Sequence, residues 1–536
     1  MNAVAAERRA SRRPPAALVA VAVVVVAAVT LPLAYLVIRA LSGGWDAFDV
    51  LVSGRVARLL LDTALLTVAV TLGAAAIGIP LAWLVTMSDV PARRVWAVLA
   101  ALPLVIPSYV AALALIAAFG PSGLLQQALE RPFGVERVPA VYGFPGAFAA
   151  LVLSTYPYVY VLAAAAFREA DRSLEDAARG LGRGPVGVFR SVTLPVAAPS
   201  ITAGSLLVAL YVLADFGAVS LMRYDSLTRA IFLQYRSLLD RTPAAVLALV
   251  LVALTVIVVG LEARSRGRAR FHRTSPGASR PVPPVALGRW RLPALALCAG
   301  VATFALAVPL AVLGYWLARA LSSGAPLEAA WRAALNSVFA SGLAAGVVVA
   351  AVLPVAVLAV RYPSRLSRVL EVGGFASNAL PGIVIALALV FFAARYAGPI
   401  YQTLALLVFA YVVRFFAPAL AATRSAILAI DPSLEEAARG LGRTRTGAFA
   451  AVTAPLLAPG LLAGATLVFL STMKELPATL LLRPIGFDTL ATEVWTATAN
   501  GAYSQAAVPA LLLIGASAPF VYLLTARRVT ALIGSG

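Results

Sequence analysis

The sequence is poor in the residues that build disulfides, soft-metal sites and nucleotide-binding loops. It has one cysteine, Cys298, and one histidine, His272, among 536 residues. A disulfide framework or a Cys/His metal cluster within one chain is therefore excluded. The single lysine, Lys474, follows "FLSTM", so a phosphate-binding loop of the form GxxxxGK[ST] is excluded as well. We expect no catalytic residues, no metal ligands, no cofactor and no nucleotide hydrolysis in this chain.

Charged residues are also scarce. They make up 12% of the sequence, whereas hydrophobic residues make up 61% and the mean hydropathy is +0.92; a soluble domain has roughly a quarter charged residues. Membrane helices need about 20 apolar residues each. The first such run, residues 16–41, follows four arginines and is longer than the apolar core of a signal peptide, about 7 to 15 residues. We interpret it as an uncleaved first helix with a cytoplasmic N-terminus.

Apolar runs between polar breaks predict an all-α polytopic membrane protein with about twelve transmembrane helices. With the N-terminus inside, the inner segments hold 28 of the 43 Lys and Arg residues, which also places the C-terminus in the cytoplasm. The net charge of +20 is thus interpreted as membrane topology rather than nucleic-acid binding. The expected spans are 16–40, 59–86, 96–118, 144–167, 197–221, 243–261, 292–318, 334–360, 369–394, 401–423, 456–475 and 506–526, with possible re-entrant segments in 119–143 and 476–505.

A basic segment divides the chain. Residues 262–291 contain eight arginines and one acid, together with Pro, Gly and Ser, which is typical of a flexible cytoplasmic linker. An RNA or lipid role for it is the alternative. The expected organisation is a cytoplasmic N-terminus (1–15), a first transmembrane domain (16–261), the linker (262–291), a second transmembrane domain (292–526) and a cytoplasmic C-terminus (527–536).

The two transmembrane domains are copies of each other. "AARGLGR" occurs at 177–183 and again at 437–443, and residues 173–200 align without a gap to 433–460. Upstream, "IPSYVAALALI" from Ile106 matches "LPGIVIALALV" from Leu380; downstream, "ADFGAVSLMR" from Ala214 matches "KELPATLLLR" from Lys474. Both copies of the motif must lie on the same side of the membrane, so each half needs an even number of spans. The chain is therefore predicted to be a parallel 6+6 duplication rather than an inverted repeat.

Each copy of the motif predicts a short cytoplasmic helix. Ser173 and Ser433 are followed three residues later by Asp176 and Glu436, the spacing of a capping box. In the second copy an Asp-Pro pair at 431–432 offers a competing start.

Glycines at the end of each motif, Gly180, Gly182, Gly440 and Gly442, permit the left-handed backbone that ends a helix. A helix this short is not stable alone. Its small alanines and flanking arginines predict an element that docks on another surface; the alternative is a polar connector whose likeness records only gene duplication.

The pattern resembles the EAA loop of ABC importer permeases, in which Glu-Ala-Ala is followed by Gly, a hydrophobic residue and Leu-Pro at fixed spacing. In the first copy Asp replaces Glu, and in the second Ala454 replaces Leu. The loops span 173–195 and 433–455, and the resemblance covers both halves apart from the linker. The matching positions are Asp176, Ala177, Ala178, Gly182, Val192, Leu194 and Pro195 in the first copy, and Glu436, Ala437, Ala438, Gly442, Val452 and Pro455 in the second.

This resemblance implies the permease subunit of an ATP-driven importer. In that family the loop forms a coupling helix that inserts into a separate ATP-binding subunit. The expected partners are two copies of that subunit, which would bind ATP and Mg, a periplasmic or extracellular solute-binding protein, and membrane lipid, with no nucleic acid. The expected location is the bacterial inner membrane.

Charged residues inside spans are candidates for the translocation pathway, because their insertion is costly. Asp215 and Glu475 occupy equivalent places in the repeat, Lys474 adjoins the latter, and Arg414 lies in "YVVRFFAP". Counting about 20 residues from Pro195 and Pro455 puts both acids near the outer ends of their helices. The alternatives are interfacial acids with local partners and, for Arg414, a packing or counter-ion role.

Residues 214–232 and 471–495 resemble ferric-iron importer permeases, which are also single chains with two fused halves. Hard Fe(III) prefers oxygen ligands. Acids and tyrosines that could supply them are Asp215, Tyr224, Asp225, Glu475 and Asp488. Fused permeases for thiamine or phosphonates are the alternatives within the class. An ion-gradient-driven secondary transporter, which would need no docking loops, and a structural membrane scaffold are the alternatives outside it.

Overall fold

The structure is a computed structural model of the chain, and it describes residues 14–42, 51, 53–120, 123–134, 141–169, 172–236, 242–268, 284–324 and 328–533. These residues are overwhelmingly helical, and the extended pairing among them is a single bridge between Ser88 and Val285. Ten of the described helices are long and apolar enough to cross a membrane, and one bent pair of helices raises the number to eleven. The expected all-α polytopic fold is confirmed.

The helices form two compact units. Unit 1 contains Met1–Val50, Ile231–Val252 and Glu328–Thr492, and unit 2 contains Leu51–Ala230, Ala253–Leu327 and Glu493–Gly536. Each unit also includes the first apolar segment of the other sequence half, residues 16–41 in unit 1 and residues 291–322 in unit 2. The compact units and the sequence repeats are therefore different divisions of the chain. Helices α13 (Leu227–Arg236), α14 (Thr242–Arg268) and α25 (Leu490–Ala499) run across a boundary between the units.

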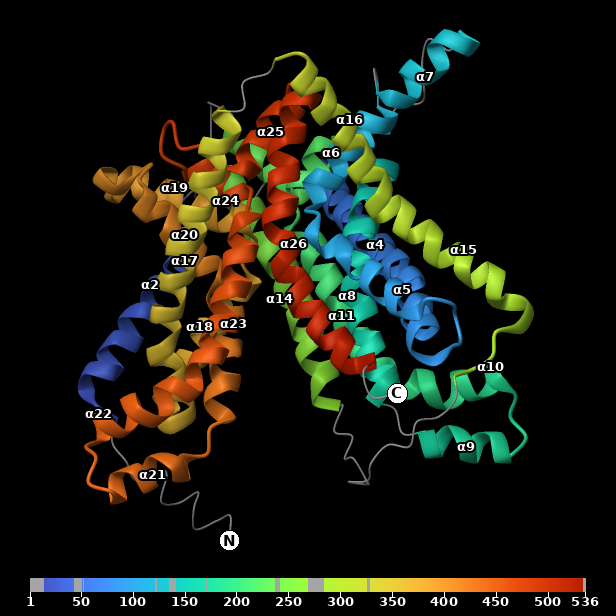
Figure 1. Cartoon of the computed structure of the whole chain (residues 1–536). Helices are drawn as coiled ribbons and strands as arrows, with labels where there is room; N and C mark the ends of the chain where they lie inside the picture. Colours follow the sequence, from blue (N-terminus) through green and yellow to red (C-terminus); the bar gives the residue numbers. More distant parts are fainter. Residues whose placement is uncertain are drawn as a thin grey trace. The chain divides into compact units, whose positions relative to one another are not determined.

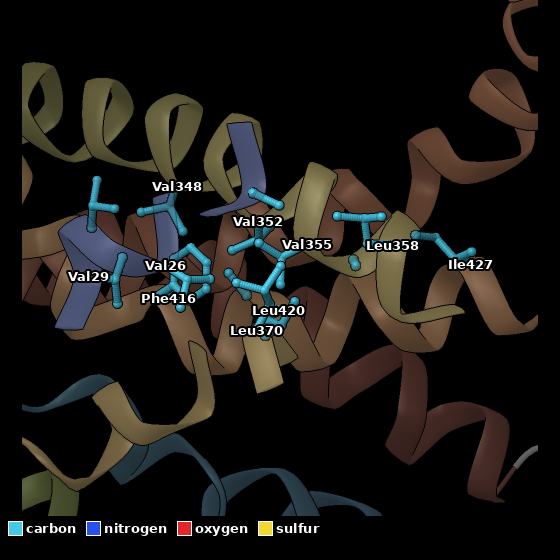
Figure 2. Packing of buried hydrophobic residues seen from close by; sticks show 14 of the residues in the cluster. Val26, Val29, Val348, Val352, Val355, Leu358, Leu370, Phe416, Leu420 and Ile427 are labelled. Atoms are coloured by element: carbon cyan, nitrogen blue, oxygen red, sulfur yellow. The ribbon is translucent and has the colours of Figure 1, made fainter. Parts of the chain in front are cut away.

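In unit 1, the N-terminal helix α2 (Ala16–Leu41) packs against α17 (Glu328–Arg361) and α20 (Leu404–Leu428) (Figure 1). Figure 2 shows why: valines spaced by three or four residues line one face of α17 and meet valines of α2 and an aromatic ring of α20. In lipid, this close packing is what holds helices together. The residues are Val348, Val352 and Val355 of α17, Val26 and Val29 of α2, and Phe416 and Leu420 of α20. The other helices of unit 1 are α18 (Arg365–Ala376), α19 (Gly382–Tyr396), α21 (Pro432–Gly440), α22 (Arg445–Ala448), α23 (Ala454–Met473) and α24 (Pro477–Leu482).

In unit 2, α8 (Phe144–Glu169) packs against α4 (Gly54–Met87) and α11 (Leu194–Ala214), and these two helices also contact each other. Small residues let the backbones approach. A Cβ added at Gly78 of α4 would lie 2.9 Å from the backbone nitrogen of Tyr160 on α8. The other helices of unit 2 are α5 (Arg93–Leu99), α6 (Ser108–Phe119), α7 (Leu124–Phe133), α9 (Arg172–Gly180), α10 (Pro185–Val188), α12 (Gly217–Leu221), α15 (Arg291–Ala302), α16 (Val308–Ser322) and α26 (Tyr503–Ile533).

Two expected spans are broken at equivalent prolines. The expected span 96–118 divides into α5, a 3-10 turn and α6, and the expected span 369–394 divides into α18, a 3-10 turn and α19, with a bend of 104°. Pro107 and Pro381 stand directly before α6 and α19. A residue that precedes proline avoids the helical region, and Ile106 and Leu380 are accordingly extended. These segments are largely apolar, so hydropathy alone does not reveal the breaks.

Two further spans end earlier than expected. Helix α11 ends at Ala214 and α23 at Met473, and each is followed by a short helix, α12 or α24. The last expected span, 506–526, lies within α26, whose side chains beyond residue 519 are outside the described part. Short helices, α7 in one case and α24 and α25 in the other, occupy the two stretches in which re-entrant segments were considered.

The end of the predicted linker is fastened to the segment after α4. The backbone nitrogen of Val285 donates to the carbonyl oxygen of Met87 (2.8 Å), and the nitrogen of Asp89 donates to the carbonyl oxygen of Val285 (3.1 Å). The nitrogen of Leu287 donates to Oδ1 of Asp89 (2.9 Å). Residues 269–283 and 1–13 lie outside the described residues. This end of the linker is thus ordered by backbone pairing within unit 2.

Gly78→Ala should destabilise the chain, because its methyl group has no room between α4 and α8. Overpacking of this kind costs about 1–3 kcal/mol. Gly342→Ala is the matched control, since this glycine of α17 has nothing within 4 Å of an added Cβ. Thermal unfolding of the two variants in detergent checks the prediction, and equal unfolding temperatures would contradict it.

Candidate functional site

The two copies of the motif form the same structure. In unit 2, α9 is followed by a turn, the four-residue helix α10, a π-helical segment (Phe189–Thr193) and α11. In unit 1, α21 is followed by a turn, α22, a π-helical segment (Phe449–Thr453) and α23. The helices α9 and α21 are nine residues long. We call these two the motif helices.

The second motif helix begins with the Asp-Pro pair. Asp431 is the N-cap and its Oδ1 accepts from the backbone nitrogen of Ser433 (2.9 Å), with Pro432 in the first turn. The aspartate start is confirmed, and a cap by Ser433 is wrong for this copy. The side chain of Ser173, the corresponding residue of the first copy, lies outside the described residues.

A glycine with a left-handed backbone follows each motif helix, two residues after its last helical residue. Gly182 and Gly442 have φ of 81° and 87°, in the left-handed region that favours glycine. In each copy the amide of this glycine and the amide of the next residue donate back to carbonyl oxygens of the last helical turn, as in a Schellman motif. The expected left-handed ends are confirmed at these two glycines. They are wrong at Gly180 and Gly440, which are still helical.

One face of each motif helix is turned inward. Glu175 is 2% exposed and its Oε1 accepts from Oγ1 of Thr193 (2.7 Å). In the other copy, Oε1 of Glu435 accepts from Oγ1 of Thr453 and lies 3.5 Å from a guanidinium nitrogen of Arg361. This pair of acids was not among the predicted site residues. The signal was present, because both the Glu and the Thr are identical in the two copies, whereas the neighbouring acid is Asp in one and Glu in the other.

The other face of each motif helix is open. Asp176, Ala177, Glu436 and Ala437 are exposed, while Ala178 is buried and Ala438 half-buried. Two leucines in the turns that follow the helices are among the most exposed apolar residues of the described chain, Leu181 at 84% and Leu441 at 87%. Pro195 and Pro455, in the first turns of α11 and α23, are exposed as well.

The two intramembrane acids lie where the helices break. Both are 8% exposed. Oδ1 of Asp215 accepts from the backbone nitrogens of Ala218 (3.0 Å) and Val219 (3.3 Å), and a carboxylate oxygen of Glu475 accepts from those of Ala478 and Thr479 (3.1 Å each). Each acid therefore satisfies the free amides at the start of α12 or α24. Of the two alternatives considered for these acids, a pathway residue or an interfacial acid with local partners, the geometry provides the local partners of the second.

The acids also touch the broken helices. Oγ of Ser108, at the start of α6, donates to Oδ2 of Asp215. Gly382 is the equivalent residue of α19, and a Cβ there would lie 2.6 Å from Oε1 of Glu475. The longer acid therefore stands opposite glycine and the shorter acid opposite serine. The two copies fill the same space with different residues.

The two cations near Glu475 differ in environment. Nη1 of Arg414 donates to the carbonyl oxygen of Leu380 (3.1 Å), at the break before α19, so this arginine satisfies a backbone group left over by the break. Lys474 is the C-cap of α23 and is partly buried. Both residues belong to unit 1, as does Glu475, whereas Asp215 belongs to unit 2.

Three of the oxygen donors considered for Fe(III) are engaged with other groups of the protein. In unit 2, the hydroxyl of Tyr224 donates to the carbonyl oxygen of Asp62 (2.8 Å), and Asp225 pairs with Arg229. In unit 1, Asp488 pairs with Arg483. Across the described ranges no group of three or more His, Cys, Asp or Glu residues could hold a metal ion.

The fold and the paired motif helices define a class: a polytopic membrane protein built from two copies of one transmembrane module, each with a short helix beside the start of a later membrane helix. A family model agrees with this description. Residues 74–270 and 342–531 each match the binding-protein-dependent transport system inner membrane component. The chain belongs to this family of transport permeases, and it carries the family domain twice.

Individual relatives match either most of this chain or less than half of it. The chain is 33% identical over 518 residues to the Fe(3+)-transport system permease protein FbpB 2 of Haemophilus influenzae, covering 96% of this chain and 98% of that protein. It is 27% identical to a probable ABC transporter permease protein of Sinorhizobium fredii, with coverage of 85% and 84%. The molybdenum transport system permease protein ModB of Mycobacterium tuberculosis is 29% identical and matches 44% of this chain over 89% of its own length. Most of this shorter relative thus corresponds to somewhat less than half of this chain's length.

Gly382→Ser should destabilise the chain, and Glu475→Asp should do so as well, but the two changes together should recover most of the loss. The double variant recreates the Ser108–Asp215 arrangement of the other half, so we expect a coupling of about 0.5–3 kcal/mol. A double-mutant cycle on thermal unfolding measures it. Additive losses would show that the two positions do not share one space.

Proposed function

We propose that this chain is the transmembrane subunit of an ATP-driven importer, and that the motif helices are the docking elements for a separate ATP-binding subunit. The observation that carries the proposal is the outer face that the two copies share. A single exposed apolar residue is ordinary on a protein surface. Here an exposed leucine, a small alanine and an acid recur in the same places, 260 positions apart.

The shared face fits a protein partner. Leu181 and Leu441 would fill apolar pockets, Ala177 and Ala437 allow close approach, and Asp176 and Glu436 add charge complementarity. Two such faces on one chain support two copies of the ATP-binding subunit. ATP and Mg would be bound there, because this sequence has no phosphate-binding loop. The chain itself would then be a transport subunit and no enzyme.

Ferric iron is the proposed cargo. The permease of H. influenzae that matches nearly the whole chain is a ferric-iron permease by name, whereas the molybdenum permease matches one half. A solute-binding protein would deliver the ion, and the chain would pass it without a resident metal site. Thiamine, phosphonate and molybdenum are the alternatives within the class. A secondary transporter is disfavoured because it has no use for two docking faces.

The proposed location is the bacterial inner membrane, with both termini and both motif helices on the cytoplasmic side, as the arginine distribution favours. Asp215, Arg414, Lys474 and Glu475 are proposed to act on the translocation pathway by fixing the broken helices beside it. Asp215 and Glu475 set where α12 and α24 begin, and Arg414 holds the break before α19. Substitution of these residues would change uptake without removing the docking faces.

Leu181→Glu combined with Leu441→Glu should abolish recovery of the ATP-binding subunit with the purified chain. Burial of one leucine contributes about 1.5–3 kcal/mol, so each docking face should lose at least about tenfold in affinity for its own copy of the subunit. Ile485→Glu, at a residue that is 90% exposed and distant in sequence from both motifs, is the control. Undiminished co-purification of the double variant would argue against docking through these faces.

Cells that lack the gene should regain uptake of labelled ferric iron when the wild-type chain, its ATP-binding subunit and its binding protein are restored. Labelled molybdate and thiamine serve as the competing substrates. Uptake should stop when ATP is depleted and persist when the proton gradient is collapsed. Uptake of molybdate or thiamine alone would reassign the cargo, and uptake without the ATP-binding subunit would point to a secondary transporter.

A further inference from the structure

We propose that Glu175 and Glu435 are positioning residues, which fasten the motif helices to the membrane helices through the hydroxyls of Thr193 and Thr453. This inference rests on the proposed function, because it explains how movement of a docked ATP-binding subunit would reach the membrane helices. It concerns the inner face of the motif helices rather than the docking face.

Each motif helix needs such a fastening. A helix of nine residues is not stable by itself in water. Glu175 precedes Asp176 on the same helix, so their side chains are about 100° apart around its axis. One therefore faces inward while the other faces solvent, as their exposures confirm. A buried carboxylate without a partner is costly, and the threonine hydroxyl provides that partner.

In the first copy, the fastening consists of one short bond and one ion pair. Oγ1 of Thr193 donates to Oε1 of Glu175 (2.7 Å), and a guanidinium nitrogen of Arg179 lies 3.5 Å from Oε2. Both Glu175 and Thr193 are almost inaccessible to solvent. Since Arg179 belongs to the same helix as Glu175, the threonine is what links this helix to the next element.

In the second copy, the same bond is joined by a cation from a membrane helix. Thr453 donates to Glu435, and Arg361, the last residue of α17, lies 3.5 Å from the same oxygen. The motif helix α21 is thus tied to both α17 and the segment before α23. The Glu–Thr bond is common to both copies, whereas the supporting arginine is not.

The threonines occupy a special place in the backbone. Each is the last residue of a five-residue π-helical segment, and the membrane helix α11 or α23 begins at the next residue. Such π segments within helices are rare and frequently mark functional sites. In unit 2, aromatic rings pack against the π segment. The ring centroid of Phe189 lies 6.2 Å from that of Trp83 on α4 and 6.3 Å from that of Phe167 on α8. A displacement of the motif helix would therefore be passed through the carboxylate to the base of the membrane helix.

The test is the double variant Thr193→Val and Thr453→Val, which keeps the shape of the side chain and removes the donor. Thr193→Ser with Thr453→Ser keeps the donor and is the conservative rescue. Ser191→Ala is a second control, because Ser191 lies in the same π segment, its hydroxyl donates to the carbonyl oxygen of Gly187 within that stretch, and the corresponding residue of the other copy is alanine. All variants retain the docking leucines.

The first measurement is hydrogen exchange of the α9 and α21 amides in the purified full chain without its partner. A hydrogen bond to a charged group corresponds to a factor of about ten or more in an equilibrium, so the Val variant should exchange about tenfold faster there, and the Ser and Ser191→Ala variants at the wild-type rate. The second measurement is labelled ferric iron transported per ATP hydrolysed in the reconstituted complex. It should fall about tenfold in the Val variant, while the ATP-binding subunit is still recovered.

Unchanged exchange in the Val variant would overturn the inference, because the fastening would then not hold the motif helices. Faster exchange with an unchanged ratio of transport to hydrolysis would overturn the positioning role and leave only a local structural one. Equal losses in the Val and Ser variants would also count against it. Failure of the wild-type chain to recover any ATP-binding subunit would instead overturn the proposed function, and the exchange result would remain interpretable.

Discussion

The constraint on which this structure depends is that backbone polar groups in a membrane must find partners within the protein. A continuous helix meets it automatically, but this chain interrupts its helices at equivalent places in the two halves. Each interruption frees amides or carbonyls. The carboxylates of Asp215 and Glu475 accept hydrogen bonds from the free backbone amides of α12 and α24. The guanidinium of Arg414 donates a hydrogen bond to the free carbonyl oxygen of Leu380. The charged residues inside the spans are thus what permits the broken geometry.

Comparison of the two halves shows which features of the helix breaks are the same in both copies and which differ. The acid at the break is retained in both halves, but its length differs, and the residue opposite changes with it from Ser108 to Gly382. Both halves therefore have an acidic residue at the same position, but the acid and the residue opposite it divide the available space differently in the two halves. The motif helices show the same division. Their Glu–Thr bond is common, and the cation that supports it comes from within the helix in one copy and from α17 in the other.

Much of this arrangement could be predicted from sequence because its signals are local or repeated. The left-handed Gly182 and Gly442, the Asp-Pro start of α21 and the all-α membrane fold all follow from residue type and spacing. The helix breaks could not be found from hydropathy, since segments 96–118 and 369–394 are largely apolar and the extended residue at each break is marked only by the proline that follows it, Pro107 or Pro381. Glu175 was missed for a different reason. Asp176 fitted the known spacing better, and burial of its neighbour depends on a threonine 18 positions later.

Fusion of the two halves adds a consequence that neither half has alone. Unit 1 contains α2 and unit 2 contains α15 and α16, so each compact unit is completed by the first helix of the other sequence half. In unit 2, the end of the linker is fixed to the segment after α4 by backbone pairing at Val285, immediately before α15. The linker therefore does more than join two domains, because its end sets where the first helices of the second half begin. The exchanged helices pack by small and aliphatic side chains, as Val26 and Val29 do against α17, and such packing depends on close approach rather than on any one strong contact. The motif helices are held differently, by a Glu–Thr hydrogen bond that an arginine supports in each copy. Extensive apolar packing thus preserves the exchanged framework, whereas a few polar contacts fix the motif helices to their neighbours.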